Sequence, residues 1–266
     1  MKKLFLTMGL LLVSFGAACA ACVAIYGDSR TNHEIHRQIV EAIIKTEPEA
    51  VFHVGDLVAN GEDPKEWARF NEIAAPLTAR AKLFPLLGNH DLGGTNFEDN
   101  FELPGNERWY CIERIGVLFV LLDDNSTLQP GSPQYRWLEN VLREQGGRAA
   151  FRVVMFHRPI FTTGKPMEDE AGIKDALMPL FARYGVSLVV NGHVHAYERL
   201  RVKGIDFVIT GGGGAPLYQQ VRTRPESRVY LPVHHFCQLC ATARQLTVKA
   251  IGIDGKVIDQ FTVSRK

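Results

Sequence analysis

The amino-acid sequence predicts one α/β domain made of two packed sheets with helices outside them. Two observations lead to this prediction. Short apolar runs alternate with amphipathic segments in the N-terminal part of the chain, as in β-α-β units with a mainly parallel sheet. The later part is richer in strand-like runs, which supply the second sheet. No stretch resembles an interdomain linker, so the predicted domain covers residues 22–266.

The individual elements follow from periodicity and from glycine and proline. Ile35, Ile39 and Ile43 recur at helical spacing before Pro48, for example, and Asp254-Gly255 is a hairpin signal. The predicted helices are 33–45, 64–79, 133–144 and 173–184. The predicted strands are 22–26, 50–54, 82–87, 109–115, 117–122, 151–156, 186–190, 205–209, 230–239, 245–251 and 257–263.

The N-terminus has the pattern of an export signal. A basic start is followed by an apolar run over 4–15 and by small residues over 16–21, which predicts a signal peptide over residues 1–20. The run is too short for a membrane span, which needs about 20 apolar residues. Cleavage near Ala20 is one outcome. The other is a lipid anchor on Cys19, although the residue three places earlier is Gly16 instead of the usual Leu. Both outcomes predict an exported protein that is periplasmic, secreted or lipid-anchored.

The charge gives no indication of nucleic-acid binding, and the spacing of the cysteines is explained better by a strand than by a metal site or a disulfide between them. The net charge of +1 gives no basic footprint for nucleic acid, so we expect no nucleic-acid partner, and nothing implies a stable protein partner. Cys237 and Cys240 are spaced like a metal or disulfide pair. Because they lie in a predicted strand, their thiols should point to opposite faces, and we expect neither.

Metal-binding residue types stand just beyond five of the predicted strands. Because the carboxyl ends of parallel strands form the ligand-binding edge of an open α/β sheet, these side chains should meet. Carboxylate, amide oxygen and imidazole ligands suit Zn²⁺, Mn²⁺ or Fe, and no obvious thiolate accompanies them. Each motif alone is weak, but the ordered set predicts a metal site. The residues are Asp28, Asp56, Asn89-His90-Asp91, His157, His193 and His195.

These motifs resemble the five ordered motifs of calcineurin-like metallophosphoesterases, and the run 192–199 and the glycine-rich run 210–216 are similar to the purple acid phosphatase branch. The resemblance implies a four-layer α/β/β/α sandwich. It also implies a dinuclear centre of divalent or mixed-valence ions (Fe, Mn or Zn).

The resemblance assigns a role to each motif residue. Asp56 would bridge both metals. Asp28 and His195 would bind one metal, and the other would be held by Asn89, His157 and His193. His90 would face the substrate without being a ligand, near the phosphoryl oxygens or the leaving group, and Asp91 would hold its ring.

Two positions depart from the family pattern. Ala59 stands where purple members have a tyrosine ligand, and Arg30 stands where many other members have a histidine. Water, His33 or His36 could fill the gap in the first metal's ligands. Arg30 could turn toward the substrate phosphate, which makes it a third candidate catalytic residue beside His90 and Asp91, or it could form an ion pair with an aspartate.

The implied function is hydrolysis of a small-molecule phosphate ester by a metal-bound hydroxide, without a covalent enzyme intermediate. The enzyme would be a hydrolase of the acid phosphatase type. Two alternatives remain open. The same site could act on phosphodiesters or cyclic nucleotides, with loops 97–107 and 162–172 setting specificity. Alternatively, the protein could be a degenerate, non-catalytic metal-binding protein.

Overall fold

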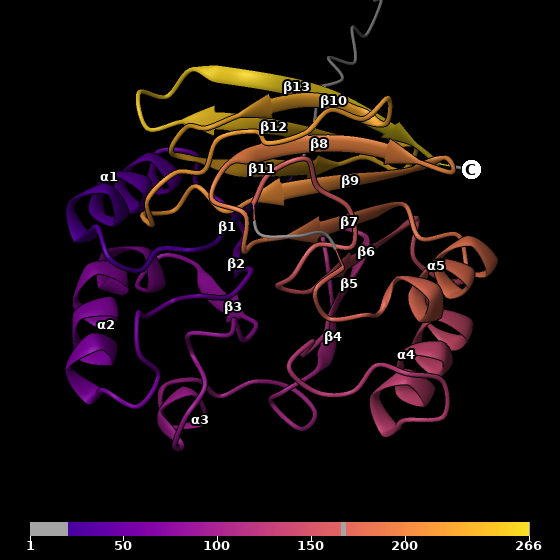
Figure 1. Cartoon of the computed structure of the whole chain (residues 1–266), viewed down its shortest axis with the longest axis horizontal. Helices are drawn as coiled ribbons and strands as arrows, with labels where there is room; N and C mark the ends of the chain where they lie inside the picture. The colour runs from indigo at the N-terminus through magenta and orange to yellow at the C-terminus, as the bar shows by residue number, and fades with distance from the viewer. Residues whose placement is uncertain (1–20, 166–168, 266) are drawn as a thin grey trace, which may run out of the picture.

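The computed structural model describes residues 21–165 and 169–265, and two sheets face each other in this part of the chain (Figure 1). The first sheet has the order β13-β12-β11-β1-β2-β3 and the second the order β10-β8-β9-β7-β6-β5-β4. The first sheet contains β1 (Cys22–Tyr26), β2 (Ala50–His53), β3 (Lys82–Pro85), β11 (His235–Ala241), β12 (Gln245–Gly252) and β13 (Val257–Ser264). The second contains β4 (Tyr110–Arg114), β5 (Val117–Leu121), β6 (Phe151–Met155), β7 (Leu188–Asn191), β8 (Tyr197–Val202), β9 (Ile205–Thr210) and β10 (Ser227–Leu231).

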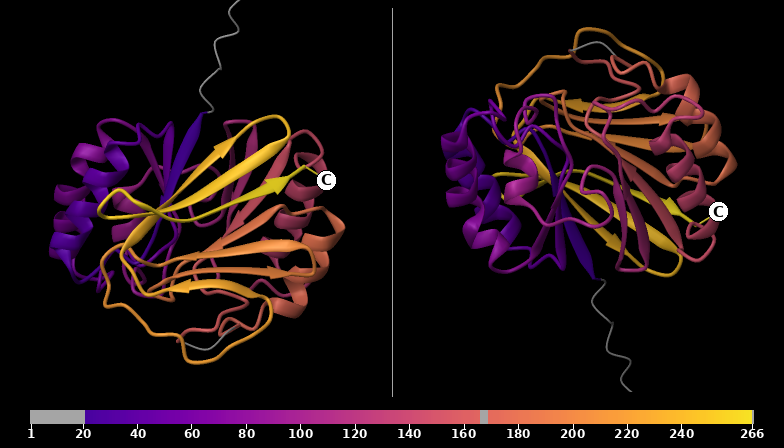
Figure 2. Two further views of the ribbon diagram at one scale, coloured as in Figure 1. Left: turned by 90° about the horizontal axis from the view of Figure 1, so that it is seen from above. Right: turned by 90° about the horizontal axis from the view of Figure 1, so that it is seen from below.

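Helices cover the outer face of each sheet. One pair, α1 (His33–Ile44) and α2 (Pro64–Thr78), lies beside the first sheet, and α4 (Pro133–Glu144) and α5 (Lys174–Arg183) lie beside the second (Figure 2). The short α3 (Asn96–Asn100) lies near α2. The predicted four-layer α/β/β/α architecture is therefore confirmed.

Local sequence signals start these helices. The Asn32 side chain accepts a hydrogen bond from the Ile35 amide at the start of α1, and Ser132 accepts one from the Tyr135 amide at the start of α4. Both contacts satisfy an amide that has no partner inside the helix. The apolar stripe of α1 is buried against the sheet, as its spacing predicts.

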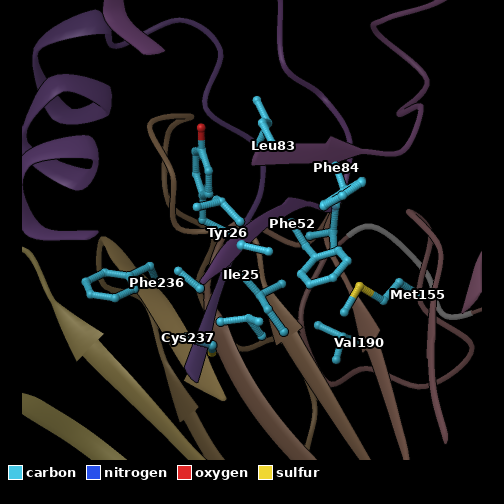
Figure 3. Close-up of a cluster of buried hydrophobic side chains, with 14 of the residues drawn as sticks. Ile25, Tyr26, Phe52, Leu83, Phe84, Met155, Val190, Phe236 and Cys237 are labelled. Atoms are coloured by element: carbon cyan, nitrogen blue, oxygen red, sulfur yellow. The ribbon is translucent and has the colours of Figure 1, made fainter. Parts of the chain in front are cut away.

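The main core fills the space between the two sheets. Figure 3 shows Ile25 and Phe52 of the first sheet facing Met155 and Val190 of the second. The rings of Phe52 and Phe119 lie 4.4 Å apart between centroids, which joins β2 to β5. Dense packing of this kind fixes the two sheets relative to each other, so that the strand ends of both keep a fixed spacing.

A polar contact also joins the sheets. The Tyr197 hydroxyl and the Arg199 Nε of β8 each donate to the Asp259 carboxylate of β13 at 2.7 Å. Arg199 also lies over the Phe261 ring at 5.0 Å from its centroid. These two residues of the run 192–199 therefore connect the sheets and do not face the pocket described below.

Three elements differ from the sequence-based expectation. The single strand predicted over 230–239 is wrong, because the segment forms β10 and β11, which belong to different sheets and are separated by Pro232. Proline has no amide to donate to a ladder, so the chain crosses between the sheets there. Neither β8 nor α3 was predicted, because Glu198, Arg199 and Arg201 interrupt the apolar pattern of β8 and α3 is too short for periodicity. The predicted Asp254-Gly255 hairpin is confirmed between β12 and β13.

A disulfide joins the first strand to the later part of the first sheet. Cys22 and Cys240 are opposite each other in the antiparallel β1–β11 pair, with Cα atoms 4.1 Å apart. Cys237 is buried in the core and forms no disulfide, so the expected divergence of Cys237 and Cys240 is confirmed. The pairing of Cys240 with Cys22 was not foreseen.

The predicted signal peptide, including Cys19, lies outside the described residues. Within residues 21–165 and 169–265, no helix is both long and apolar enough to cross a membrane.

Breaking the disulfide should lower stability. The bond closes a loop with a sequence separation of 218 residues. We expect Cys240→Ser to lower the free energy of unfolding by about 2–5 kcal/mol, because the bond restricts the unfolded chain. Urea denaturation measures this, with Cys111→Ser as the control at a cysteine outside the bond. Equal midpoints for Cys240→Ser and the wild type would contradict the structure.

A buried neutral histidine should make the fold acid-sensitive. His36 of α1 stacks on Phe70, and its Nε2 lies 3.3 Å from the Tyr26 hydroxyl. Burial, with smaller effects from His33 and Arg37, lowers the pKa of His36 to about 3. In the unfolded chain His36 binds a proton near its ordinary pKa of about 6.5, whereas in the folded chain it stays neutral until the pH is much lower. The free energy of unfolding therefore falls as the pH drops from about 6.5 toward 3.

We expect this histidine to cost the wild type about 2 kcal/mol of stability between pH 7 and pH 5. In His36→Gln, which cannot titrate, that part of the loss should disappear, whatever the change in stability at pH 7. Urea denaturation of both proteins at the two pH values gives the comparison. Parallel losses in the two proteins would show that His36 is not buried as a neutral group.

Candidate metal centre

The structure brings the predicted strand-end residues of both sheets to one edge. Asp28 follows β1 and Asp56 follows β2, while His157 follows β6 and His193 and His195 follow β7. They form two groups in which one ligand atom from each residue lies within 4.8 Å of the others. The first ligand group is Asp28, Asp56 and His195, and the second is Asp56, His157 and His193. Only Asp56 belongs to both groups, as a bridging ligand would.

Three of these residues have a backbone conformation that residues other than glycine rarely adopt. The φ angles are +57° at Asp28, +56° at Asp56 and +68° at His193. Such conformations cost energy in residues other than glycine, persist only where the surroundings hold them, and cluster at functional sites. The His193 amide donates to the Asp28 carboxylate at 2.9 Å, so one turn helps to hold the other.

Two glycines allow the turns to pack closely. A side chain on Gly88 would overlap the backbone nitrogen and carboxylate of Asp56, and one on Gly213 would overlap the carbonyl of Gly27. The Gly213 amide donates to that same carbonyl at 2.9 Å. The glycine-rich run therefore packs against the Gly27-Asp28 turn, because only glycine leaves room there.

Each of the three histidines has one ring nitrogen in contact with a partner outside the two ligand groups. The Nδ1 of His157 lies 2.8 Å from the Val54 carbonyl, and the Nδ1 of His195 lies 2.7 Å from that of Pro216. His193 is reversed, with its Nε2 2.9 Å from the Glu170 carboxylate. A proton on each of these nitrogens leaves the other with a lone pair for a cation, as in metal-binding histidines.

The electrostatics of the site favour a positive charge. Burial alone would lower the pKa of His157, but the carboxylates of Asp56, Asp28 and Asp124 raise it to about 10. Burial opposes ionisation of Asp56 as well, yet His157 and His90 lower its pKa. These buried carboxylates therefore create a field that a metal cation would satisfy.

An unpartnered oxygen lies next to His90 in the turn after β3. The Asn89 Oδ1 is buried and makes no hydrogen bond with the described residues. A buried carbonyl oxygen without a partner is costly, and a cation would compensate it. With Asn89, the Asp56, His157 and His193 group offers carboxylate, imidazole and amide donors that fit Zn²⁺, Mn²⁺ or Fe.

The first ligand group has an arginine beside it. The Arg30 Nε donates to the Asp56 Oδ2 at 3.1 Å, and its Nη2 lies 3.4 Å from the His195 Nε2. Of the two expectations for Arg30, the ion pair with an aspartate is therefore the contact observed. His36 is a buried residue of α1 itself. Among the described residues, neither His33 nor His36 belongs to either ligand group.

His90 faces the pocket, but Asp91 does not hold it. The His90 Nδ1 lies 3.0 Å from the Ala59 carbonyl, which corrects the expected contact with Asp91. The buried Asp91 carboxylate instead accepts from the amides of Asp56 at 2.7 Å and Gly88 at 2.8 Å. It therefore fixes the turns after β2 and β3, because those amides have no partner in a ladder.

Two supporting carboxylates were not predicted from the sequence. Asp124 accepts hydrogen bonds from the amides of His157 at 3.2 Å and Arg158 at 2.8 Å, which fixes the turn after β6. Asp124 lies just beyond β5, so the strand-end pattern that found the other residues could have found it. Glu170 has no such signal, because it lies in a loop.

The ligand groups open into a cavity of about 540 Å³. Its lining residues are Arg30, Asp56, His90, Lys165, Glu170, His193, His195 and Tyr218. The loop 162–172 thus contributes to the cavity through Lys165 and Glu170, as expected. The loop 97–107 contributes nothing to this lining, since Phe97 and Phe101 pack around Trp67.

Comparisons with known proteins agree with this geometry. Residues 23–197 match the family model of calcineurin-like phosphoesterases. A barley nucleotide pyrophosphatase/phosphodiesterase is 25% identical over 81% of this chain and 72% of its own length. A probable purple acid phosphatase of Arabidopsis thaliana is 28% identical over 66% of this chain, which spans only 45% of that protein.

The fold comparison gives the same result. A purple acid phosphatase from yellow lupin superposes with a TM-score of 0.84 at 21% identity, covering 93% of this chain and 54% of that protein. The similarity to solved structures establishes the fold, and the match over residues 23–197 establishes the family. The chain belongs to the calcineurin-like phosphoesterase family, in its purple acid phosphatase-like branch.

Proposed function

We propose that this protein is a metal-dependent hydrolase of phosphate esters. The observation that carries the proposal is the position of Asp56, whose carboxylate belongs to two ligand groups at the wall of one cavity. Two ligand groups that share a carboxylate are the arrangement used to clamp a phosphoryl group between ions. The family membership supports the same reaction class.

The residues that would hold the ions are those of the two groups. Asp56, Asn89, His157 and His193 would hold one ion, and Asp28, Asp56 and His195 would hold another, with Fe, Mn or Zn suited to these donors. When bound, the metal supplies an acidified water as nucleophile and neutralises charge on the phosphoryl oxygens.

His90 is the residue best placed to move a proton. Its ring lines the cavity, and a proton on Nδ1 is held by the Ala59 carbonyl. When the ring carries a proton on both nitrogens, Nε2 can donate to a leaving oxygen or to the phosphoryl group. Asp91 acts through the backbone, by holding the turns of Asp56 and Gly88.

The names of the relatives represent two classes of phosphate-ester substrate. The barley relative is named a pyrophosphatase/phosphodiesterase and the Arabidopsis relative an acid phosphatase. We propose a small phosphate ester, because the cavity of about 540 Å³ suits a small molecule. The rival, a non-catalytic metal-binding protein, rests on Ala59 and Arg30 at the first ligand group.

We also propose that residues 1–20 direct export and that residues 22–266 form the catalytic domain. The Cys22–Cys240 disulfide supports export, because such bonds persist in oxidising compartments. Cys19 could then carry a lipid, which fatty-acid labelling of the exported protein would detect.

Replacing the shared carboxylate should remove bound metal and abolish the activity. Asp56→Asn keeps the size of the side chain but removes the charge common to both groups. We expect metal content to fall and hydrolysis to disappear, while the fold persists. Metal analysis, an ester assay and circular dichroism give the three readouts, with Asp175→Asn at an exposed position of α5 as the matched control. Wild-type metal content together with a wild-type rate in Asp56→Asn would reject the assigned centre.

Removing His90 should separate catalysis from metal binding. We expect His90→Ala to keep its metal and to lower kcat by about 10²–10⁴-fold, because a general acid contributes on this scale. His33→Ala, at the start of α1, is the control and should leave kcat unchanged. A smaller loss for esters with good leaving groups would indicate protonation of the leaving oxygen. Loss of metal would show that His90 is a ligand, and an unchanged kcat would remove it from the mechanism.

A further inference from the structure

The two ligand groups are not equivalent, because Arg30 contacts two residues of the first group, Asp56 and His195, but within the second group its described contact is with the shared Asp56. The Arg30 guanidinium contacts Asp56 through Nε at 3.1 Å and His195 through Nη2 at 3.4 Å. Those are two of the three residues of the first group, and the atoms involved, Oδ2 and Nε2, can both bind a metal.

The groups also differ in the number of donors they offer. The Asp56 Oδ1 that His157 approaches to 3.3 Å also accepts from the His90 amide. The unpartnered Oδ1 of the adjacent Asn89 is therefore a further donor available on the side of the second group. Ala59 gives the first group no side-chain donor. A metal at the first group would therefore have fewer protein ligands and would have to displace the guanidinium from Asp56 and His195.

Burial and neighbouring side chains hold Arg30 in this position. Its side chain is only 15% exposed, and its partner Asp56 is buried. The Tyr218 ring stacks on His195 at 4.1 Å between centroids, which fixes the imidazole that faces Arg30. A guanidinium stays protonated in proteins, so its positive charge persists at any working pH.

We propose that Arg30 is the resident cation of the first ligand group, so that each chain binds one metal ion tightly, at the second group. This inference rests on the proposed function for its meaning. The guanidinium then provides the second positive charge beside the metal, in a fork that can also contact phosphoryl oxygens from the cavity wall.

Removal of Arg30 should therefore create a second tight metal site. In Arg30→Gln the ligand atoms of Asp56 and His195 no longer face a charged donor. Because a metal at the first group would no longer have to displace this charge-assisted contact, we expect it to bind there about 10- to 100-fold more tightly. Arg37→Gln, which removes an arginine of α1 whose contact is with Glu72, is the matched control.

The experiment measures metal per chain. The proteins are loaded with excess Mn²⁺, desalted and analysed by elemental mass spectrometry, and Mn²⁺ affinities are measured by calorimetry. We expect one tightly bound ion in the wild type and in Arg37→Gln, and two in Arg30→Gln. Circular dichroism checks that Arg30→Gln is folded, and the wild-type value alone can decide against the proposal.

Two tight ions of similar affinity in the wild type would overturn the role of Arg30 and leave the proposed phosphoesterase intact. One ion in folded Arg30→Gln would also overturn it, since the guanidinium would then not limit the first group. No ion in the wild type would reject this inference and the proposed metal centre together.

Discussion

The site depends on the buried carboxylate of Asp56, which both ligand groups share. Its backbone has a φ of +56°, and the amide that this conformation exposes donates to Asp91 at 2.7 Å. Asp91 also binds the amide of Gly88, a position that only glycine can occupy beside Asp56. One carboxylate thus holds another in a strained position, and the ligand groups follow from that position.

The fold supplies the rigidity that this arrangement needs. Asp28 and Asp56 come from the first sheet and the three histidines from the second, so the site is formed only where the two sheets meet. The core between the sheets and the contacts of Tyr197 and Arg199 with Asp259 hold that junction. The low dielectric of the buried edge strengthens the field that attracts a cation.

Most of the site could be predicted from the sequence because its residues follow strands directly. The glycines before Asp28, Asp56 and Asn89 made those strand ends visible. What sequence could not supply was contact between segments far apart in the chain. The register that pairs Cys22 with Cys240, the Glu170 contact from a loop and the Ala59 carbonyl that holds His90 all depend on tertiary packing. The crossing at Pro232 was missed for the same reason, because strand periodicity does not identify the sheet.

Metal-dependent ester hydrolysis in this cavity can be tested directly. The protein from residue 21 onward is stripped with a chelator and assayed against phosphate mono- and diesters, with Fe, Mn²⁺ or Zn²⁺ restored singly and in pairs. We expect no hydrolysis by the stripped protein, and we expect hydrolysis to recover when a suitable metal is added. Hydrolysis that persists after complete removal of metal, or none with any metal on any ester, would contradict it.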